Sequence, residues 1–425
     1  MNDSHQQYYI RTLQKKVLET SQSFSVVLIT GPRQVGKTTL FLQCMELEKS
    51  LKRSYISLDD MKVRHLAKTD PELFLQTYRF PILIDEVQYA PELFPYIKIM
   101  CDREQKSGLF WLTGSQQFSM MHHISESLAG RVGILQLQGL SQSEINFTPD
   151  IAPFIIPESL PISGENDTEE KTDYSLKTLY ARFLRGSYPA LYSRPQTDTE
   201  TFYSSYIQTY LERDVRSLLR VKEQHSFFEC MRVLASRTGQ LLNYNDVSRD
   251  IGVSVNTVKS WVSILETSGV VYLLQPWSSN LTNRAIKTPK LYFLDTGLCC
   301  FLTGWKTAET LMDGIMNGSI FETYVVSEVL KSWIHNGKIP PLYFYRDKEK
   351  HEIDILMEYE GLVHPVEIKK TANPDLSMTK GFRSLEKTGV KMGKGAVICL
   401  YPSYLPLSRS IFSVPLWNPF TVSAH

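Results

Sequence analysis

Residues 25–39 read SVVLITGPRQVGKTT, an apolar run followed by a glycine-containing loop and a pair of threonines. The loop Gly31–Thr38 fits the pattern G-x-x-x-x-G-K-[ST], and the residues after it are typical of a helix. Gly31 and Gly36 let the backbone close around an anion without a clash of Cβ atoms. The N–H groups of the loop and of the helix start then face that anion. The order strand, loop, helix predicts a phosphate-binding loop.

The residues that end this loop predict the ligand. Lys37 can reach the β- and γ-phosphates of a nucleoside triphosphate, and the Thr38 hydroxyl can bind Mg²⁺. Thr39 extends the hydroxyl pair into the first turn of the helix. ATP and Mg²⁺ are therefore the expected cofactors.

A second apolar run, PILIDE at residues 81–86, ends in two carboxylates about 50 residues after the loop. Asp85, at the strand end, is expected to hold Mg²⁺ through water. Glu86 is expected to polarise the attacking water, because one acid on the metal and one near the γ-phosphate divide the work of hydrolysis.

Two further polar positions are candidates for the same site. The run LFWLT at 109–113 continues into Gly114 and Ser115, and a polar side chain here could orient the water or sense the γ-phosphate. Ser115 is the first choice and Thr113 the second, although Thr-Gly-Ser is also a common turn. Arg131 could act on the nucleotide of a neighbouring subunit, which would require a homo-oligomer. A structural ion pair is the equal alternative.

Apolar runs alternate with helix-like stretches through residues 1–150, at 25–30, 53–58, 81–85 and 109–113. This alternation predicts an α/β fold in which a parallel sheet is covered on both faces. At 425 residues and 48.8 kDa the chain is too long for one ordinary domain. We expect an ATPase core over 1–150, an acidic linker and helical lid over 151–225, a winged-helix domain over 226–300 and a nuclease-like domain over 301–425.

The composition bounds the class of protein. The chain has 46 Lys and Arg against 45 Asp and Glu, so a polycationic nucleic-acid coat is excluded. No apolar run approaches the ~20 residues that span a bilayer. The N-terminus is polar, and the six cysteines are scattered. A reduced, cytoplasmic protein without a membrane partner is the expectation.

Residues 245–274 have the pattern of a helix-turn-helix followed by a wing strand. The two helices are expected at 245–251 and 255–268, with Ser254 as the N-cap of the second. Asn256, Thr257, Lys259 and Ser260 would face outward, where they could meet the major groove of DNA. The stretch 201–290 has eleven basic and seven acidic residues, which is mild for DNA binding. Packing or oligomer contact is the alternative use of this element.

The C-terminal part contains a spaced set of carboxylates. Asp354 lies in the strand-like run 352–356, and Glu367 and Lys369 share one face of the next strand by period-two alternation. Glu322 lies in a helix-like stretch before them. Asp with E-x-K across a hairpin is similar to the PD-(D/E)xK nucleases, in which carboxylates bind Mg²⁺ and the lysine positions water. A solvated hairpin and a nuclease fold kept as scaffold are the alternatives.

Taken together, GPRQVGKTT, ILIDEVQYAPELF, WLTGSQQF and SLAGRVGILQLQGLSQSE resemble AAA+ ATP-binding proteins with a C-terminal domain of unknown function of the DUF4143 type. The resemblance extends through YIR at 9–11, GSYP at 186–189 and KLYFLDTGL at 290–298. It implies an AAA+ core with a helical lid, Ser115 as sensor and Arg131 as arginine finger. It also implies that Gly186 and Pro189 belong to a lid element near the adenine. Leu140 departs from the family pattern, but only in a turn.

The predicted function is binding and hydrolysis of ATP, which would switch a winged-helix and nuclease-like module acting on DNA. The alternative is a non-catalytic, nucleotide-gated regulator that binds DNA or protein through a degenerate nuclease fold. Intact Glu86, Asp354, Glu367 and Lys369 favour catalysis.

Overall fold

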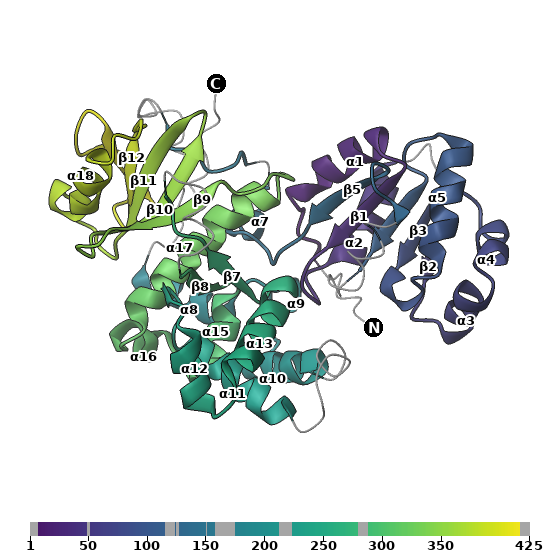
Figure 1. Ribbon diagram of the computed structural model, residues 1–425, viewed down its shortest axis with the longest axis horizontal. Coiled ribbons are helices and arrows are strands. Elements are labelled where there is room, and N and C mark those ends of the chain that lie inside the picture. The colour runs from purple at the N-terminus through teal and green to yellow at the C-terminus, as the bar shows by residue number, and fades with distance from the viewer. Residues whose placement is uncertain are drawn as a thin grey trace.

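The computed structural model describes residues 7–48, 52–114, 124, 127–149, 151–157, 175–211, 223–278 and 288–416. Sheets of five, three and six strands follow one another along the chain (Figure 1). Helices separate the sheets, so the expected α/β class is confirmed. Residues 158–174, which belong to the expected acidic linker, lie outside the described residues.

The first sheet is parallel throughout and has the order β2-β3-β4-β1-β5. Its strands are β1 (Val26–Thr30), β2 (Ser54–Ser57), β3 (Ile82–Asp85), β4 (Phe110–Thr113) and β5 (Val132–Gln136). Four of these five strands coincide with the apolar runs predicted from the sequence. β1 lies between β4 and β5, and after β1 the chain crosses to β2 at the far edge of the sheet. The connections from β1 and from its neighbour therefore leave in different directions, and such a point usually forms a crevice at the carboxyl ends of the strands.

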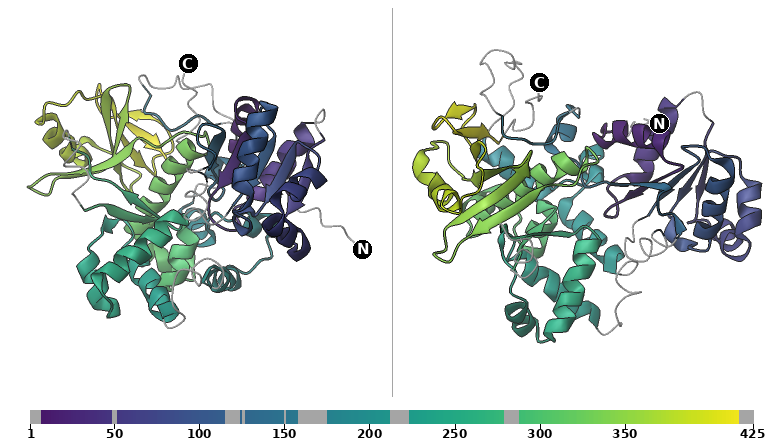
Figure 2. Two further views of the ribbon diagram at one scale, coloured as in Figure 1. Left: turned by 45° about the vertical axis from the view of Figure 1, so that its right-hand side comes forward. Right: turned by 45° about the horizontal axis from the view of Figure 1, so that its top comes forward.

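Helices cover both faces of this sheet (Figure 2). Val27 and Ile29 of β1 face a core that includes α1 (Leu13–Ser23) and α2 (Lys37–Leu47). Val26 and Leu28 face the opposite core. That core is built with α3 (Met61–Thr69), α4 (Pro71–Thr77) and α5 (Leu93–Glu104), and the short 3-10 helix η1 (Val87–Tyr89) follows β3. The alternation of side chains along a strand that is apolar on both sides produces this three-layer arrangement.

The middle of the chain is mainly helical. Its helices are α7 (Gln142–Ile145), α8 (Leu176–Arg185), α9 (Pro189–Ser193), α10 (Thr199–Tyr210), α11 (Gln224–Ala235), α12 (Tyr244–Ile251) and α13 (Val255–Thr267). A small antiparallel sheet of order β6-β8-β7 joins them, with β6 (Gln240–Leu241), β7 (Val271–Leu274) and β8 (Lys290–Phe293).

The predicted helix-turn-helix is present as α12 and α13. Ser254 caps α13 by accepting a hydrogen bond from the Thr257 N–H, as the sequence predicts. Of the four residues expected to face outward, Asn256, Lys259 and Ser260 are exposed, whereas Thr257 is half-buried. Trp261 packs in the core together with Val258, Val262 and Leu265 of this helix.

The C-terminal part begins with α15 (Thr296–Thr303), α16 (Ala308–Asp313) and α17 (Asn317–Ile334). A six-stranded mixed sheet follows, of order β13-β14-β12-β11-β10-β9. Its strands are β9 (Leu342–Arg346), β10 (Glu352–Tyr359), β11 (Leu362–Ile368), β12 (Gly395–Cys399), β13 (Leu405–Pro406) and β14 (Ile411–Pro415). The 3-10 helix η4 (Leu376–Thr379) and α18 (Lys380–Glu386) lie between β11 and β12.

One apolar core connects these parts. It runs from α1 and α2 through the middle helices to α17 and the C-terminal sheet. All six cysteines are buried thiols without disulfides, in agreement with the sequence. Across the described ranges, no helix combines the length and apolar character that crossing a bilayer requires.

Candidate nucleotide site and C-terminal carboxylate cluster

The glycine-rich loop joins β1 to α2 at the carboxyl edge of the parallel sheet. Gly31 and Gly36 have φ values of +142° and +92°, which residues other than glycine rarely adopt. A Cβ on Gly31 would lie 2.0 Å from the Leu137 carbonyl oxygen, so the loop also needs glycine for space. The two glycines of the motif are therefore required by the backbone itself.

Lys37 is buried and folds back onto its own loop. Its Nζ donates hydrogen bonds to the carbonyl oxygens of Gly31, at 3.0 Å, and Pro32, at 2.7 Å. These oxygens hold the ammonium over the cradle formed by the loop. A phosphate group in that cradle would meet the positive charge directly.

Asp85 is the centre of a polar cluster at the end of β3. The Thr38 hydroxyl donates to Asp85 Oδ1 at 2.7 Å, and the Thr113 hydroxyl donates to the same oxygen. Tyr55 donates to Asp85 Oδ2 at 3.3 Å. A hydroxyl and a carboxylate that face each other are hard oxygen ligands of the kind Mg²⁺ prefers. Thr38 and Asp85 therefore fit the predicted role of holding Mg²⁺ beside the loop.

Glu86 follows in an unusual backbone conformation, with φ 58° and ψ 45°. Its N–H donates to the Thr113 hydroxyl at 3.0 Å, and its carboxylate accepts a hydrogen bond from the Gln88 amide. Left-handed backbone at a non-glycine residue costs free energy and often marks functional sites. Thr113 thus links the two acidic residues, because its hydroxyl donates to the Asp85 carboxylate and accepts from the Glu86 N–H.

The loop and Glu86 line one cavity of about 370 Å³. It is lined by Arg33, Gln34, Gly36, Lys37, Thr38, Thr39, Glu86 and Thr209. The volume is in the range of small-molecule sites in proteins. Thr209 comes from α10, so the helical part of the chain closes one side of the cavity.

The predicted lid element lies against the loop. A Cβ on Gly36 would be 3.9 Å from Pro189 Cγ. Gly186 has φ +75°, and a Cβ there would lie 2.0 Å from the Tyr203 hydroxyl. Ser187 donates from both its N–H and its Oγ to Asp295 Oδ2, each at 2.7 Å. Pro189 therefore lies beside the phosphate loop and Gly186 beside Tyr203 and Asp295, while their role as a lid element near adenine stays a prediction.

The two other predicted polar groups have different outcomes. Ser115 lies outside the described residues, and Thr113, the second choice, contacts Asp85 and the Glu86 N–H, so its role towards water or the γ-phosphate stays a prediction. Arg131 directly precedes β5, and its carbonyl accepts from the Val26 N–H at the start of β1. It therefore lies at the opposite edge of the sheet from the loop. It makes a two-point ion pair with Asp102, at 2.6 and 3.0 Å.

For Arg131 the structure thus contains the alternative interaction named from the sequence. It cannot reach the nucleotide cavity of its own chain from that edge. A role as arginine finger would require a second subunit and release of Asp102, and it stays a prediction.

A buried ion-pair junction behind the loop was not assigned from the sequence. Arg11 donates to the Val35 carbonyl oxygen at 2.8 Å and to the Gln138 carbonyl oxygen at 2.7 Å, and its Nε lies 3.1 Å from Glu144 Oε2. On the other side, Glu144 Oε1 is 3.3 Å from His335 Nδ1. This junction ties the phosphate loop to α7 and to the end of α17.

The protonation of this junction follows from its surroundings. Burial alone would raise the pKa of Glu144, but the charge of Arg11, together with hydrogen bonds from the His335 ring and the Ser141 N–H, holds it well below its usual value. Burial lowers the pKa of His335. His335 Nε2 accepts from the Gln138 N–H at 3.3 Å, so the neutral ring carries its proton on Nδ1, towards Glu144.

In the C-terminal sheet, the predicted hairpin brings three side chains together. β10 and β11 are antiparallel, with Ile355 opposite Val366, so the neighbouring residues Asp354 and Glu367 also face each other. Lys369 Nζ lies 2.6 Å from Glu367 Oε2 and 3.4 Å from Asp354 Oδ2. The Ile368 N–H donates to Asp354 Oδ2 at 2.8 Å. The period-two alternation predicted this convergence correctly.

Glu322 reaches the same cluster from α17, but a lysine that the sequence did not single out stands beside it. Lys290 Nζ is 3.2 Å from Glu322 Oε1, 2.6 Å from Glu352 Oε1 and 3.9 Å from Asp354 Oδ1. Tyr292 donates to Glu322 Oε1 at 2.6 Å. We call Glu322, Glu352, Asp354 and Glu367, with Lys290 and Lys369, the carboxylate cluster.

Crowding of charge shifts the pKa values in this cluster. Burial, followed by the charge of Asp354, raises the pKa of both Glu322 and Glu367. Burial would lower the pKa of Lys290, but Glu322, Asp354 and Glu352 raise it. Each lysine is therefore held as a cation by the acids around it.

The carboxylates of the cluster are ligands that suit Mg²⁺ or Mn²⁺ by donor type. Within the described ranges, however, the oxygens of Glu322, Asp354 and Glu367 do not all approach within 4.8 Å of one another. The two lysines lie between them instead. The metal site predicted here stays a prediction. The carboxylates suit a divalent cation by donor type, but the ammonium groups of Lys290 and Lys369 occupy the space between them.

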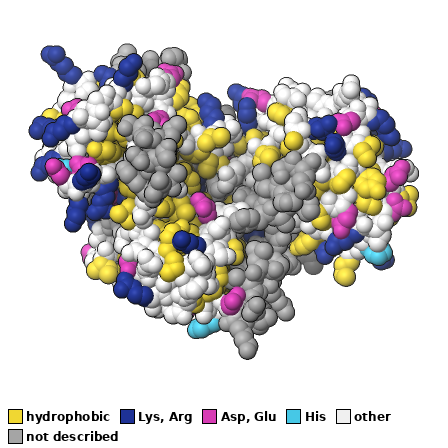
Figure 3. Space-filling model, in the orientation of Figure 1, with side chains coloured by type: hydrophobic (Ala, Val, Ile, Leu, Met, Phe, Trp, Pro, Cys, Tyr) yellow, Lys and Arg dark blue, Asp and Glu magenta, His cyan; other side chains and the backbone are white. Residues whose placement is uncertain are grey.

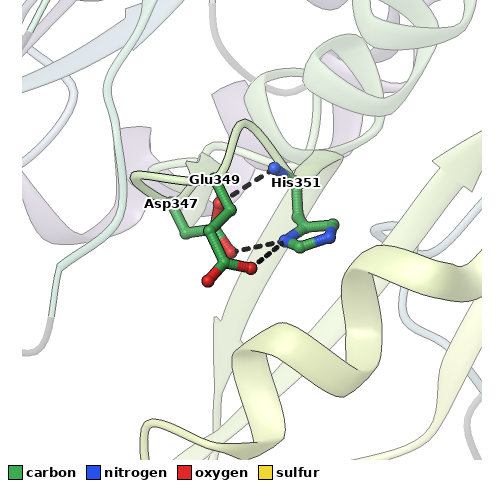
Figure 4. A group of neighbouring side chains, drawn as sticks. All are labelled: Asp347, Glu349 and His351. Carbon is green, nitrogen blue, oxygen red and sulfur yellow. Dashed lines mark hydrogen bonds and ion pairs between the residues drawn. The ribbon is translucent and has the colours of Figure 1, made fainter.

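A second acidic group lies in the turn between β9 and β10. Asp347, Glu349 and His351 gather there with ligand atoms within 4.8 Å (Figure 4). Asp347 accepts from the His351 N–H at 2.9 Å, from the His351 ring at 2.8 Å and from Ser384. These bonds stabilise the hairpin turn, and they explain why Asp347 and His351 lie close together without a bound ion.

Similarity to known proteins agrees with this geometry. Residues 23–146 match a family described as AAA domain, and residues 317–418 match the domain of unknown function DUF4143. The chain combines an AAA domain with a DUF4143 domain. The resemblance to AAA-type ATP-binding proteins is thereby confirmed. Residues 176–309 of this AAA/DUF4143 chain match a further domain of unknown function, DUF8612.

Two curated mycobacterial proteins are similar over nearly the whole chain. The uncharacterized proteins Rv2008c of Mycobacterium tuberculosis and Mb2031c of Mycobacterium bovis are each 29% identical over 393 residues, covering 92% of this chain and 80% of theirs. Among solved structures, the Walker-type ATPase PABY2304 of Pyrococcus abyssi aligns with a TM-score of 0.44 at 12% identity. That alignment covers 70% of this chain and 97% of the other.

Proposed function

We propose that this AAA/DUF4143 chain hydrolyses ATP with Mg²⁺ and uses the cycle to switch its middle and C-terminal parts. The observation that carries the proposal is the single cavity in which Lys37, Thr38 and Glu86 meet beside Asp85. Lys37 neutralises phosphate charge, and Thr38 and Asp85 hold Mg²⁺, which supplies further charge neutralisation when bound. Glu86 orients the attacking water and accepts its proton.

Contacts of the loop with the middle of the chain support the switching role. A Cβ on Gly269, directly after α13, would lie 2.9 Å from Pro32 Cγ in the phosphate loop. Pro32 also supplies one of the carbonyls that hold Lys37. Movement of Lys37 towards a phosphate would therefore change the contact between Pro32 and Gly269 at the end of the helix-turn-helix.

DNA is the partner that we propose for the switched module. The exposed Asn256, Lys259 and Ser260 of α13 support this assignment, as does the convergence of Asp354, Glu367 and Lys369. Lys and Arg side chains of the described residues are spread over both ends of the face in Figure 3. The mild charge of the chain favours a weak contact.

A second candidate is a nucleotide-gated binding protein that does not hydrolyse ATP. The hydrogen bond from Gln88 to Oε2 of the Glu86 carboxylate favours it, because the Gln88 amide competes with water for that oxygen. The two candidates agree on ATP binding and differ on turnover.

Lys37→Ala tests the shared claim of ATP binding. Loss of a charge-assisted contact worth ~1.5–3 kcal/mol should weaken ATP binding by about 10- to 150-fold in a calorimetric titration. Lys16→Ala, a change at an exposed surface pair, is the matched control and should bind like the wild type. Unchanged affinity of Lys37→Ala would remove the loop from the proposed site. Stimulation of ATP turnover by duplex DNA, measured with the wild type, tests the partner.

A further inference from the structure

Lys290 lies among the carboxylates of the C-terminal cluster but belongs to a different sheet. It is the first residue of β8 and pairs there with Leu274 of β7. Its Nζ contacts Glu322 from α17 and Glu352 and Asp354 from β10. Only 3% of its side chain is exposed. A lysine of the middle sheet therefore closes the cluster from outside the C-terminal domain.

The position of this ammonium determines the spacing of the carboxylates. Asp354 is shared, since its Oδ1 faces Lys290 at 3.9 Å and its Oδ2 faces Lys369 at 3.4 Å. Glu322 is on the Lys290 side and Glu367 on the Lys369 side. Two cations thus hold apart three acids that a single divalent ion would draw together.

We propose that Lys290 closes the carboxylate cluster against divalent cations, and that Mg²⁺ or Mn²⁺ binds there only when Lys290 withdraws. This inference rests on the proposed function insofar as that function assigns a switched C-terminal site. The cluster carries a built-in cation in the closed state. An ion and the ammonium compete for the oxygens of Glu322 and Asp354.

β8 provides the connection between this closure and the nucleotide site. Lys290 opens the strand, and Asp295 follows its end by two residues. Five residues of extended chain span ~17 Å. Asp295 accepts both hydrogen bonds of Ser187, in the lid element whose Pro189 lies against Gly36. A shift of the lid that pulls on Asp295 would act on Lys290 along the same strand.

The test is Mn²⁺ binding to the full-length protein without nucleotide, followed by electron paramagnetic resonance of free Mn²⁺. Every sample carries Asp85→Ala, which removes the acid expected to bind metal at the phosphate loop. We expect Lys290→Met to bind one Mn²⁺ at least tenfold more tightly than the protein with Lys290 intact. Addition of Asp354→Ala should abolish this gain. Lys306→Met, a change in an exposed pair with Glu200, is the matched control and should leave binding unchanged.

A second variant guards against misfolding of Lys290→Met, which leaves buried acids without their cation. Glu352→Gln keeps Lys290 but removes the charge from its 2.6 Å contact, and it should give a smaller gain in Mn²⁺ affinity. Equal or weaker binding in both variants overturns the proposal, as does absence of Mn²⁺ binding in both at millimolar concentration. ATP binding is also measured for Lys290→Met and Glu352→Gln in the protein that keeps Asp85. Failure of the Lys290 proposal with intact ATP binding leaves the proposed ATPase standing.

Discussion

Replacement of Glu144 by Gln should destabilise the protein by about 3–5 kcal/mol, the usual cost of breaking a fully buried ion pair. The side chain of Glu144 is 0% exposed and that of Arg11 is 3% exposed, with 3.1 Å between Nε and Oε2. The carboxylate also accepts hydrogen bonds from the Thr12 N–H at 2.8 Å and the Ser141 N–H at 2.9 Å. An amide would turn one acceptor into a donor that faces other donors, and it would leave the Arg11 charge without a partner.

Thermal unfolding followed by circular dichroism measures this effect. At ~2–4 °C for each kcal/mol in a domain of this size, Tm should fall by about 6–20 °C. Glu19→Gln is the matched control, because Glu19 is 49% exposed and its pair with Lys16, at 3.3 Å, should contribute less than ~1 kcal/mol. A Tm for Glu144→Gln within about 2 °C of this control would refute the assigned role of the junction. Weaker ATP binding should accompany the loss, because Arg11 also holds the Val35 carbonyl of the phosphate loop.

Two further predictions concern residues around the same sites. Thr113→Val should lower ATP turnover by about 10- to 100-fold in a steady-state assay while ATP still binds, because Asp85 loses one of its two hydroxyl donors at Oδ1 and the Glu86 N–H loses its acceptor. For pH, burial lowers the pKa of His335 from its ordinary 6.5, so its contribution to stability is present above pH 6.5 and is lost as pH falls through the folded-state value. Tm measured from pH 7.5 to pH 5 should therefore fall less steeply in His335→Gln than in the wild type, and equal slopes would contradict the assignment.

The geometry around the phosphate loop could be predicted from the sequence because the residues that form it are close together along the chain. Strand, loop and helix are contiguous, and the loop motif fixes the conformation of Gly31 and Gly36 in advance. Asp85 and Glu86 could be assigned because parallel strands place their carboxyl ends at one edge of a sheet. Asp354, Glu367 and Lys369 converge for a similar reason, since a hairpin with period-two alternation leaves little freedom.

Contacts between distant segments could not be predicted in the same way. Arg11, Glu144 and His335 are separated by more than a hundred residues along the chain, and each by itself is an ordinary charged or polar residue. Lys290 is the first residue of KLYFLDTGL at 290–298, but no residue next to it in the sequence indicates that its side chain would reach another sheet. For Arg131 the motif suggested a catalytic role, whereas the amino edge of β5 places it away from the loop of its own chain.

The central claim is that Glu86 is the base for ATP hydrolysis at the phosphate loop. The most direct measurement is single-turnover hydrolysis of Mg²⁺-ATP by the wild type and by Glu86→Gln, with ATP affinity determined for both. The amide keeps the shape of the side chain and removes the base, so hydrolysis should fall by about 10²- to 10⁴-fold at nearly unchanged ATP affinity. Hydrolysis by Glu86→Gln at the wild-type rate would contradict the assignment, and absence of turnover in the wild type itself would establish the nucleotide-gated binding protein instead.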